Sequence, residues 1–360
     1  MPPLSAIDAI SPAFDRTGKE LFRPFRPGFW LRMGFVALAT GEFYGSSGWG
    51  GMNFTMPSRR RGGYLYLDLV RPHWEYLKRY LPWIILVGLL AVVGLLFWIY
   101  VSSVFRFVLF DSVLTDRCNI KEDWRRWRHQ GMRFFLWRIC LALGVTVALG
   151  VFVGAGVLAA VATGAFRNPR GHIVLLVLGG LAAVLVLLSL VFAAALIALF
   201  ARDFVIPVMA LENVGVIEGW RRVIAMLRVE KKSYAGYVLM KIVLVVGSAI
   251  LFGILTLIAV FLLFIPISLM GVAAYLFAKT SGLLWSFPVI AIAVVLGAVI
   301  AVLMLYVIAF ISAPAMVFFQ AYVIHFMGSR YPTLGNRISP PPAPLTPPVQ
   351  TLPDAGFAPA

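Results

Sequence analysis

Long apolar runs dominate the chain between residues 83 and 311. A helix needs about 20 consecutive apolar residues to cross the hydrocarbon core of a bilayer. Five runs meet this length: Trp83–Phe105, Phe134–Val161, Ile173–Phe200, Tyr237–Ile265 and Val289–Ile311. A sixth run, Phe29–Tyr44, is shorter and contains Arg32 and Glu42, but Gly28 and the interfacial residue Trp30 mark its start. The pattern predicts an all-α, polytopic membrane protein with about six transmembrane helices.

Two shorter segments are apolar without the length of a span. Phe264–Ala278 includes Pro266 and favours a re-entrant or interfacial helix. Residues 1–27 are expected to form a cytoplasmic amphipathic segment. Within it, Ser11 is a good N-cap and Pro12 suits the first turn of a helix. Its apolar positions at helical spacing are Ile7, Ile10, Phe14 and Leu21. This segment fits a helix lying in the membrane plane, and it equally fits a solvated helix packed on its own protein.

The composition agrees with lipid as the solvent of these helices. Hydrophobic residues make up 61% of the chain and charged residues 13%, whereas a soluble domain has about 45–50% and about 25%. This excludes a soluble enzyme, a disordered chain and a secreted disulfide scaffold. Cys118 and Cys140 lie in or beside a basic segment that we expect in the cytoplasm, where thiols stay reduced.

We place the transmembrane helical domain at residues 28–330, with one long loop inside it and a tail after it. Residues 45–80 are rich in glycine and serine near their start and predict a flexible outer loop. Residues 331–360 predict a disordered proline-rich cytoplasmic tail, since 8 of the last 23 residues are proline.

The distribution of basic residues predicts the orientation. The net charge is +16, and Lys and Arg are commoner on the cytoplasmic side of membrane proteins. With six spans, the side that holds both termini carries 22 of them and the other side carries 9. Both termini are therefore expected in the cytoplasm of a bacterium, with the chain in the inner membrane. The basic residues predict contact with anionic lipid, and no nucleic-acid motif accompanies them.

An internal duplication is the most informative feature of the sequence. A shift of 96 residues aligns Arg106 with Arg202, and Glu122 with Glu218, without a gap. The same shift aligns Trp124-Arg125-Arg126 with Trp220-Arg221-Arg222. An insertion of 7 residues then places Arg138 on Lys241. The chain therefore predicts two parallel helical-hairpin repeats, at about residues 82–163 and 173–265.

Each repeat contains a basic turn that joins two spans, which we call an elbow: residues 116–126 and 212–222. Asn119 or Gly215 is a good N-cap, and the Glu three residues later completes a capping box. That Glu also precedes the two arginines by three and four residues, so it can pair with them along the helix. The motif fits a structural bend at the membrane surface, or a clamp for an anionic headgroup. The candidate residues are Arg106, Glu122, Trp124, Arg125, Arg126, Arg202, Glu218, Trp220, Arg221 and Arg222.

The sequence contains no recognisable catalytic constellation. The four histidines are scattered, and no phosphate-binding or nucleophile motif occurs, so we expect no enzyme activity, no cofactor and no metal site. Asp111 and Asp203 are expected to be hydrogen-bonded at the inner interface. The central parts of the five long spans carry no charged residue, which argues against a charge-coupled pump.

The chain resembles an uncharacterised family of bacterial multi-pass membrane proteins. The resemblance rests on Phe14-Asp15-Arg16-Thr17, on Leu21-Phe22-Arg23-Pro24-Phe25, on Arg106-Phe107 with Asp111, and on the two elbows. More distantly the chain resembles the membrane module that is fused to some glycerophosphodiester phosphodiesterases. The phosphodiesterase activity is not implied, because the soluble part and its metal ligands are absent from this sequence. The resemblance implies a membrane location.

The sequence thus predicts a non-catalytic membrane protein that contacts anionic lipid at the cytoplasmic face and acts as a scaffold or a modulator of a membrane-protein partner. The alternative is a permease-like subunit for an amphiphilic or lipid-like substrate, with the route between the repeats. A lipid-modifying enzyme ranks third, because no acid–base pair is visible.

Overall fold

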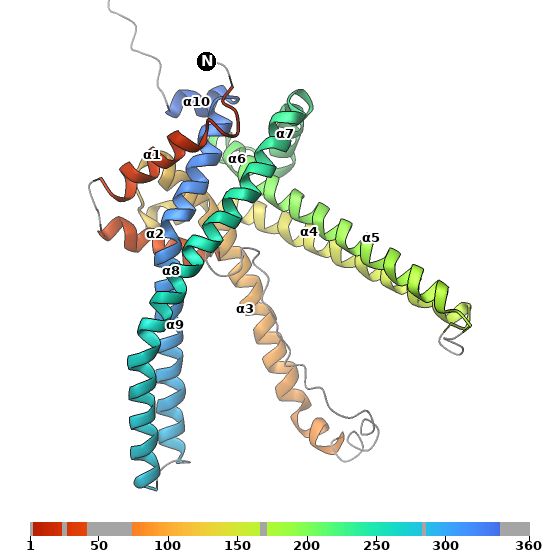
Figure 1. Cartoon of the computed structure of the whole chain (residues 1–360), viewed down its shortest axis with the longest axis vertical. Helices are drawn as coiled ribbons and strands as arrows, with labels where there is room; N and C mark the ends of the chain where they lie inside the picture. Colours follow the sequence, from red (N-terminus) through yellow and green to blue (C-terminus); the bar gives the residue numbers. More distant parts are fainter. Residues whose placement is uncertain (1–2, 24–26, 42–73, 166–170, 283–285, 339–360) are drawn as a thin grey trace, which may run out of the picture.

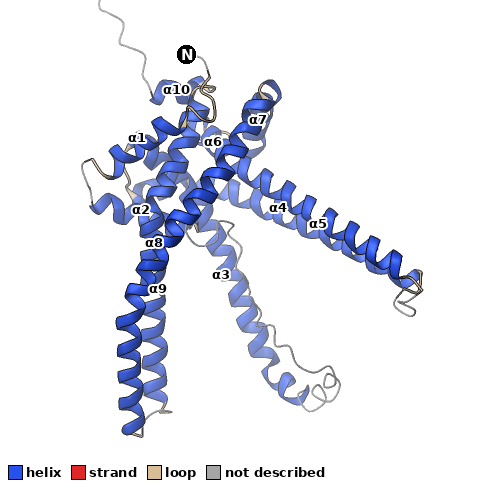
Figure 2. Ribbon diagram, viewed as in Figure 1, coloured by secondary structure: helices blue, strands red, loops and turns tan. Residues whose placement is uncertain are grey.

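The computed structural model describes residues 3–23, 27–41, 74–165, 171–282 and 286–338. Every regular element in these residues is a helix (Figure 2). The elements are α1 (Ile10–Leu21), α2 (Pro27–Thr40), α3 (Trp74–Thr115), α4 (Ile120–Ala162), α5 (Ile173–Phe200), the π-helix η1 (Ala201–Val205), α6 (Ile206–Glu212), α7 (Val216–Val229), α8 (Lys231–Thr280), α9 (Phe287–Gly328) and α10 (Pro332–Ile338). The all-α prediction is confirmed.

The helices form a hub from which three arms extend (Figure 1). The arms are the N-terminal half of α3, the α4–α5 pair, and the α8–α9 pair. The hub gathers α1, α2, α6, α7 and α10 around the inner ends of the long helices. The outer ends of α3, of the α4–α5 pair and of the α8–α9 pair therefore lie away from the hub, whereas both elbows belong to it.

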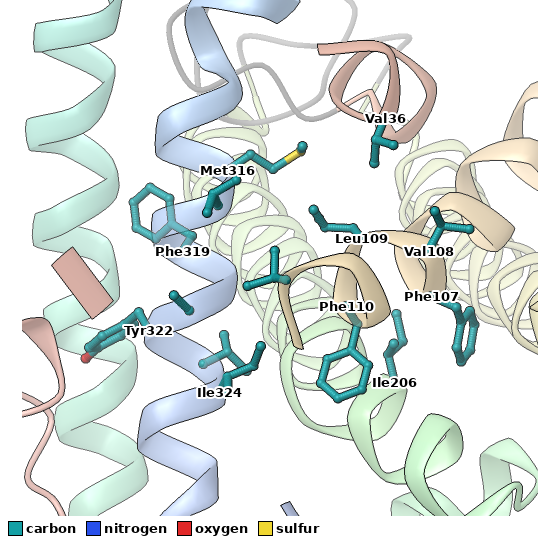
Figure 3. Close-up of a cluster of buried hydrophobic side chains, with 14 of the residues drawn as sticks. Val36, Phe107, Val108, Leu109, Phe110, Ile206, Met316, Phe319, Tyr322 and Ile324 are labelled. Carbon is teal, nitrogen blue, oxygen red and sulfur yellow. The ribbon is translucent and has the colours of Figure 1, made fainter. Parts of the chain in front are cut away.

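Buried side chains concentrate in the hub. Val36 of α2, Leu109 and Phe110 of α3, Ile206 of α6 and Met316 of α9 point into one core (Figure 3). Large apolar side chains on the arms are exposed instead, and in three long helices none of the most apolar 18 residues is buried. An apolar surface of this extent has no stable place in water, so the arms need lipid or partner helices around them.

Five helices are long and apolar enough to cross a membrane, namely those containing the five long apolar runs. The shorter run expected to begin the membrane domain corresponds to α2, which has 14 residues and ends before Gly41 at φ +70°. Fourteen residues rise about 21 Å, less than the roughly 30 Å of hydrocarbon. Half of the α2 side chains, Trp30 and Met33 among them, are buried in the hub. The expected count of six spanning helices is therefore not confirmed.

Two expectations for the second half of the chain are wrong. Residues 264–278 do not form a separate re-entrant helix, because α8 continues through Pro266 to Thr280. Residues 332–338, expected in the disordered tail, form α10, whose Leu334 is fully buried. The Tyr331 carbonyl accepts hydrogen bonds from the Leu334 and Gly335 amides, which starts this helix. The outer loop up to residue 73 and the proline-rich segment 339–360 lie outside the described residues.

The first helix packs on its own protein. Its buried face consists of Ala13, Thr17 and Leu21, while the expected apolar positions Ile7 and Phe14 are exposed. The Tyr322 hydroxyl of α9 donates to the Ala6 carbonyl at 2.9 Å, just before α1. The predicted Ser11 cap is wrong, since the helix begins at Ile10 after Ala9.

Helices α3 and α4 cross at very short range. A Cβ added to Gly131 would lie 2.8 Å from the Cα of Val104 and 3.1 Å from its Cβ. A side chain at this position would therefore push the two backbones apart. Gly144, further along α4, has open space at the corresponding position.

Candidate functional site

The most unusual feature of the hub is a group of ionisable side chains between α3, η1, α8 and α9. We call it the central polar cluster: Arg106, Arg202, Asp203, Tyr237 and Lys241. The π-helix η1 supplies Arg202 and Asp203, and Lys241 lies ten residues into α8. Single π-turns inside α-helices frequently occur at functional sites, because the wider turn re-aims its side chains.

Asp203 is the centre of this cluster, and its side chain is 4% exposed. Its Oδ2 accepts hydrogen bonds from the Lys241 ammonium and from the Tyr237 hydroxyl, the latter at 3.0 Å. Its Oδ1 accepts a hydrogen bond from Arg202 Nε at 3.2 Å. Both carboxylate oxygens are thus engaged, as a buried charge requires.

Aromatic rings enclose the Asp203–Lys241 pair. The ring of Tyr237 stacks on Tyr322 at 5.3 Å and lies 4.7 Å from Phe326, both on α9. The ring of Phe204 on η1 also lies 5.0 Å from that of Tyr237. The pair is therefore held away from water by rings from η1, α8 and α9, which strengthens its electrostatic attraction.

A narrow cleft lies beside this pair. Three cations and one carboxylate line it, namely Arg106, Arg202, Lys241 and Asp203, together with the Gln320 amide and apolar side chains such as Leu109. Arg106 and Arg202 are half-buried, and 27% of the Arg202 side chain is exposed. The cleft is therefore reachable from outside at Arg202, whose side chain is partly exposed.

The first elbow begins where α3 ends. Asp116 adopts φ +55°, and α4 starts after Asn119. The predicted capping box is wrong in its residues, because the carboxylate of Asp123, not that of Glu122, accepts the Asn119 backbone amide at 3.0 Å. Glu122 instead accepts the Asn119 side-chain amide at 2.7 Å.

The predicted residues of the first elbow divide into inward and outward groups. Trp124 is half-buried against Phe105 at 5.5 Å, and Arg125 is exposed. Arg126 reaches Asp111 at 3.4 Å, although 61% of its side chain stays exposed. Asp111 is buried and accepts a hydrogen bond from Trp127 Nε1 at 3.2 Å, as a buried carboxylate requires.

The second elbow follows the predicted side-chain pairing. Asn213 adopts φ +55°, and α7 begins at Val216, 96 positions after the first residue of α4. Glu218 pairs with Arg221 at 2.8 Å and with Arg222 at 3.5 Å, as its spacing predicts. Arg222 also pairs with Glu212.

Helix α4, which follows the first elbow, contacts the second elbow. The Gln130 amide of α4 donates to the Asn213 side-chain carbonyl, and Trp137 of α4 lies 5.9 Å from Trp220. The two elbows differ after their helix starts, because α4 continues unbroken for 43 residues whereas α7 ends at Val229 and α8 begins at Lys231. This break lies between Arg222 and Tyr237, the stretch that contains the predicted insertion of 7 residues. The duplication itself stays a prediction.

The structure therefore separates the predicted arginines into two sets. Arg106 and Arg202 face the cleft, whereas the elbow arginines lie at the surface of the hub or pair with elbow carboxylates. Sequence reasoning did not select Asp203, Tyr237 or Lys241 as site residues. The available signal was an acid and a lysine within helices that are otherwise apolar. Ionisable residues are energetically unfavourable in such helices and often have a functional role.

Within the described residues, no group of three or more His, Cys, Asp or Glu side chains could hold a metal ion. Both cysteines are free; Cys118 is buried and Cys140 is exposed. The expectation of no metal, no cofactor and no enzymatic activity stays a prediction.

These features define a class of protein: an all-helical chain with five helices able to cross a membrane, compatible with a multi-pass membrane protein. The chain belongs to a family of unknown function, DUF7544, whose profile matches residues 4–337. Comparisons with curated proteins and with solved structures give no match. A family of unknown function is thus found, whereas its bacterial origin and the resemblance to the phosphodiesterase membrane module stay predictions.

Proposed function

We propose that this protein is a non-catalytic integral membrane protein of the bacterial inner membrane, which contacts anionic lipid at the cytoplasmic face. In this role it is a scaffold or modulator of a membrane-protein partner. The hub, with both elbows, faces the cytoplasm, both termini lie on that side of the membrane, and the arms extend into the bilayer. Basic residues near the ends of apolar helices support this orientation.

A groove at the surface of the hub carries the proposal. Apolar side chains from α5, α7 and α8 line it, such as Phe192, Ile224 and Ile242, and the cations Arg228 and Lys231 lie at the same groove. Both cations are exposed. An apolar groove beside exposed cations complements an anionic phospholipid. The apolar lining suits the acyl chain, and the cations attract the phosphate.

Helix α7 extends the same chemistry along the hub. Ile217 is exposed on this helix beside Arg221, whose side chain is 76% exposed. Arg221 and Arg228 are seven residues apart and line a second hollow together with Ile224. A short helix with exposed isoleucines and arginines suits the boundary between headgroups and acyl chains.

The proposed orientation requires an even number of crossings. The five spanning helices are an odd number, so this orientation includes the sixth span that the sequence predicts at Phe29–Tyr44. The parallel-repeat arrangement belongs to the same proposal, with the elbows as its two cytoplasmic bends.

Lipid retention tests the proposal. The double variants Arg228→Ala/Lys231→Ala and Arg125→Ala/Arg221→Ala should each retain less phosphatidylglycerol in native mass spectrometry, by up to about 30-fold, since each of the two cations removed contributes about 1 kcal/mol near anionic lipid. Lys279→Ala removes one positive charge near the far end of α8 and serves as the control. Retention equal to the wild type in both double variants would refute the lipid contact.

The buried Asp203–Lys241 pair favours the second candidate, a permease-like subunit for an amphiphile. Ionisable residues inside membrane helices often mark a substrate route. Fluorescently labelled phosphatidylglycerol in proteoliposomes would be moved between leaflets by the wild type and not by the Lys241→Met variant. Movement at the protein-free rate in the wild type would exclude this candidate.

A further inference from the structure

One arginine connects helix α1 to the end of α3. The Arg16 guanidinium donates to the carbonyl of Val113 at 2.6 Å and to the carbonyl of Leu114 at 3.2 Å. Both carbonyls belong to the last turn of α3, where a helix leaves its carbonyls without partners of its own and carries partial negative charge. Arg16 therefore joins the N-terminal helix to the point where the first elbow begins.

Two carboxylates share this arginine. Glu20, one turn further along α1, accepts a hydrogen bond from Arg16 Nε at 2.7 Å, and the Asp116 carboxylate lies 3.6 Å from Arg16 Nη2. The Glu20 side chain is 3% exposed and that of Asp116 is 62% exposed. One guanidinium thus faces two carboxylates and the negative end of a helix. We call this group the α1 latch: Arg16, Glu20 and Asp116.

The buried carboxyl group of the α1 latch has one unsatisfied oxygen. Among the described residues, Glu20 Oε2 has no hydrogen-bond partner. Asp116 lies within hydrogen-bonding reach of Glu20, but two ionised carboxylates are both acceptors and repel each other. A proton on Oε2 would make it a donor toward Asp116 and would leave one carboxylate for one guanidinium. A single proton therefore satisfies the oxygen and balances the charge.

Other ionisable groups at this contact have separate roles. Helix α9 packs on α1 and contributes His325, whose half-buried imidazole lies near Arg16. Arg32 of α2 donates to the Cys118 carbonyl at 2.8 Å and is thus directed at the elbow backbone. The charged groups among the described residues that act on Glu20 are Arg16 and Asp116, so the proton belongs to the α1 latch itself.

We propose that one proton shared between Glu20 and Asp116 holds α1 on the end of α3, and that loss of this proton favours release of α1. Burial is the largest cause that raises the pKa of Glu20 to about 8, and Asp116 acts in the same direction against Arg16. In released α1 the carboxyl group is in water, with its ordinary pKa of 4.5. The contact is therefore strongest below pH 4.5 and weakens as the pH rises to 8.

These two pKa values set the size of the effect. For one proton, the equilibrium constant for release rises about 50-fold between pH 6 and pH 8. Release also frees the last carbonyls of α3, so the first elbow loses its connection to α1. This regulation goes beyond the proposed lipid contact and does not depend on it.

The test measures hydrogen exchange of the α1 backbone amides in the full-length protein in nanodiscs, at pH 6, 7 and 8. The rate in the wild type is divided by the rate in Glu20→Gln at the same pH, which cancels the intrinsic effect of pH and any effect of His325. The glutamine amide donates toward Asp116 as the protonated acid does, but it does not ionise. Asp15→Asn is the control, since it removes an exposed carboxylate from the same helix.

We expect the ratio of the wild-type rate to the Glu20→Gln rate to rise about 50-fold from pH 6 to pH 8. Asp15→Asn should give the same rise. Asp116→Asn should give a smaller rise, because Arg16 then pairs with Glu20 alone. The proposal is overturned if the ratio is constant, or if Asp15→Asn lowers the rise as much as Asp116→Asn does. A rise in Asp116→Asn equal to that of the wild type would refute the shared proton.

Discussion

The close crossing of α3 and α4 allows a quantitative test of the fold. The change is Gly131→Ala, which adds one methyl group. That carbon would lie 2.5 Å from Val104 Cγ2 and 2.8 Å from Val104 Cα, whereas carbon atoms in contact are about 3.5–4.0 Å apart. The contact with Cα cannot be relieved by a rotamer change, so the helices must separate by roughly 1 Å.

Overpacking of this kind costs about 1–3 kcal/mol. Replacing glycine by alanine inside a helix contributes about 0.5–1 kcal/mol in the opposite direction. Gly144→Ala, on the same helix with open space around it, isolates that second effect. We therefore expect the apparent melting temperature in detergent to fall for Gly131→Ala and to stay equal or rise for Gly144→Ala.

Intrinsic tryptophan fluorescence during heating measures both variants, since Trp127 and Trp137 flank the crossing on α4 and report on its separation. The difference between the two variants is the packing cost alone. Equal melting temperatures for Gly131→Ala and Gly144→Ala would refute the close crossing, and with it the α3–α4 hairpin that positions the first elbow.

Two further predictions concern buried charges. Asp203→Asn or Lys241→Met alone should lower the free energy of unfolding by about 3–5 kcal/mol, because each leaves a buried charge without its partner. The double variant should recover part of that loss. Additive losses in the double-mutant cycle would contradict the pairing. Burial raises the pKa of Glu20 to about 8, against the opposing effect of Arg16. The contribution of Glu20 to stability should therefore be full below pH 4.5 and should fall by at most about 5 kcal/mol as the pH rises to 8. Glu20→Gln should remove this contribution in a pH series of thermal melts, and a profile equal to that of the wild type would contradict it.

The helical architecture could be predicted from local sequence. Lipid cannot satisfy backbone hydrogen bonds, so an apolar run of spanning length must form a helix wherever it lies. The start of α7 at Val216 and the pairing of Glu218 with Arg221 and Arg222 also follow from local spacing. These features depend on neighbours within one or two helical turns.

Some helix boundaries could not be predicted from the sequence, because tertiary packing overrode the local signals. Pro266 does not end α8, since the helix continues on both sides of it. Leu334 is buried at α10, in a segment whose composition predicts disorder. At the first elbow, Asp123 accepts the Asn119 amide that the spacing assigned to Glu122.

The sequence by itself determined that the chain is helical, where its long helices lie, and that basic elbows join them. Only the tertiary structure decided which charges meet: Asp203 with Lys241, 38 positions apart, and Arg106 with Arg202 at one cleft. The reason is physical. Span length and capping are properties of short segments, whereas a contact between distant helices depends on how their nearly uniform apolar surfaces pack, and such surfaces carry little periodicity from which to read it.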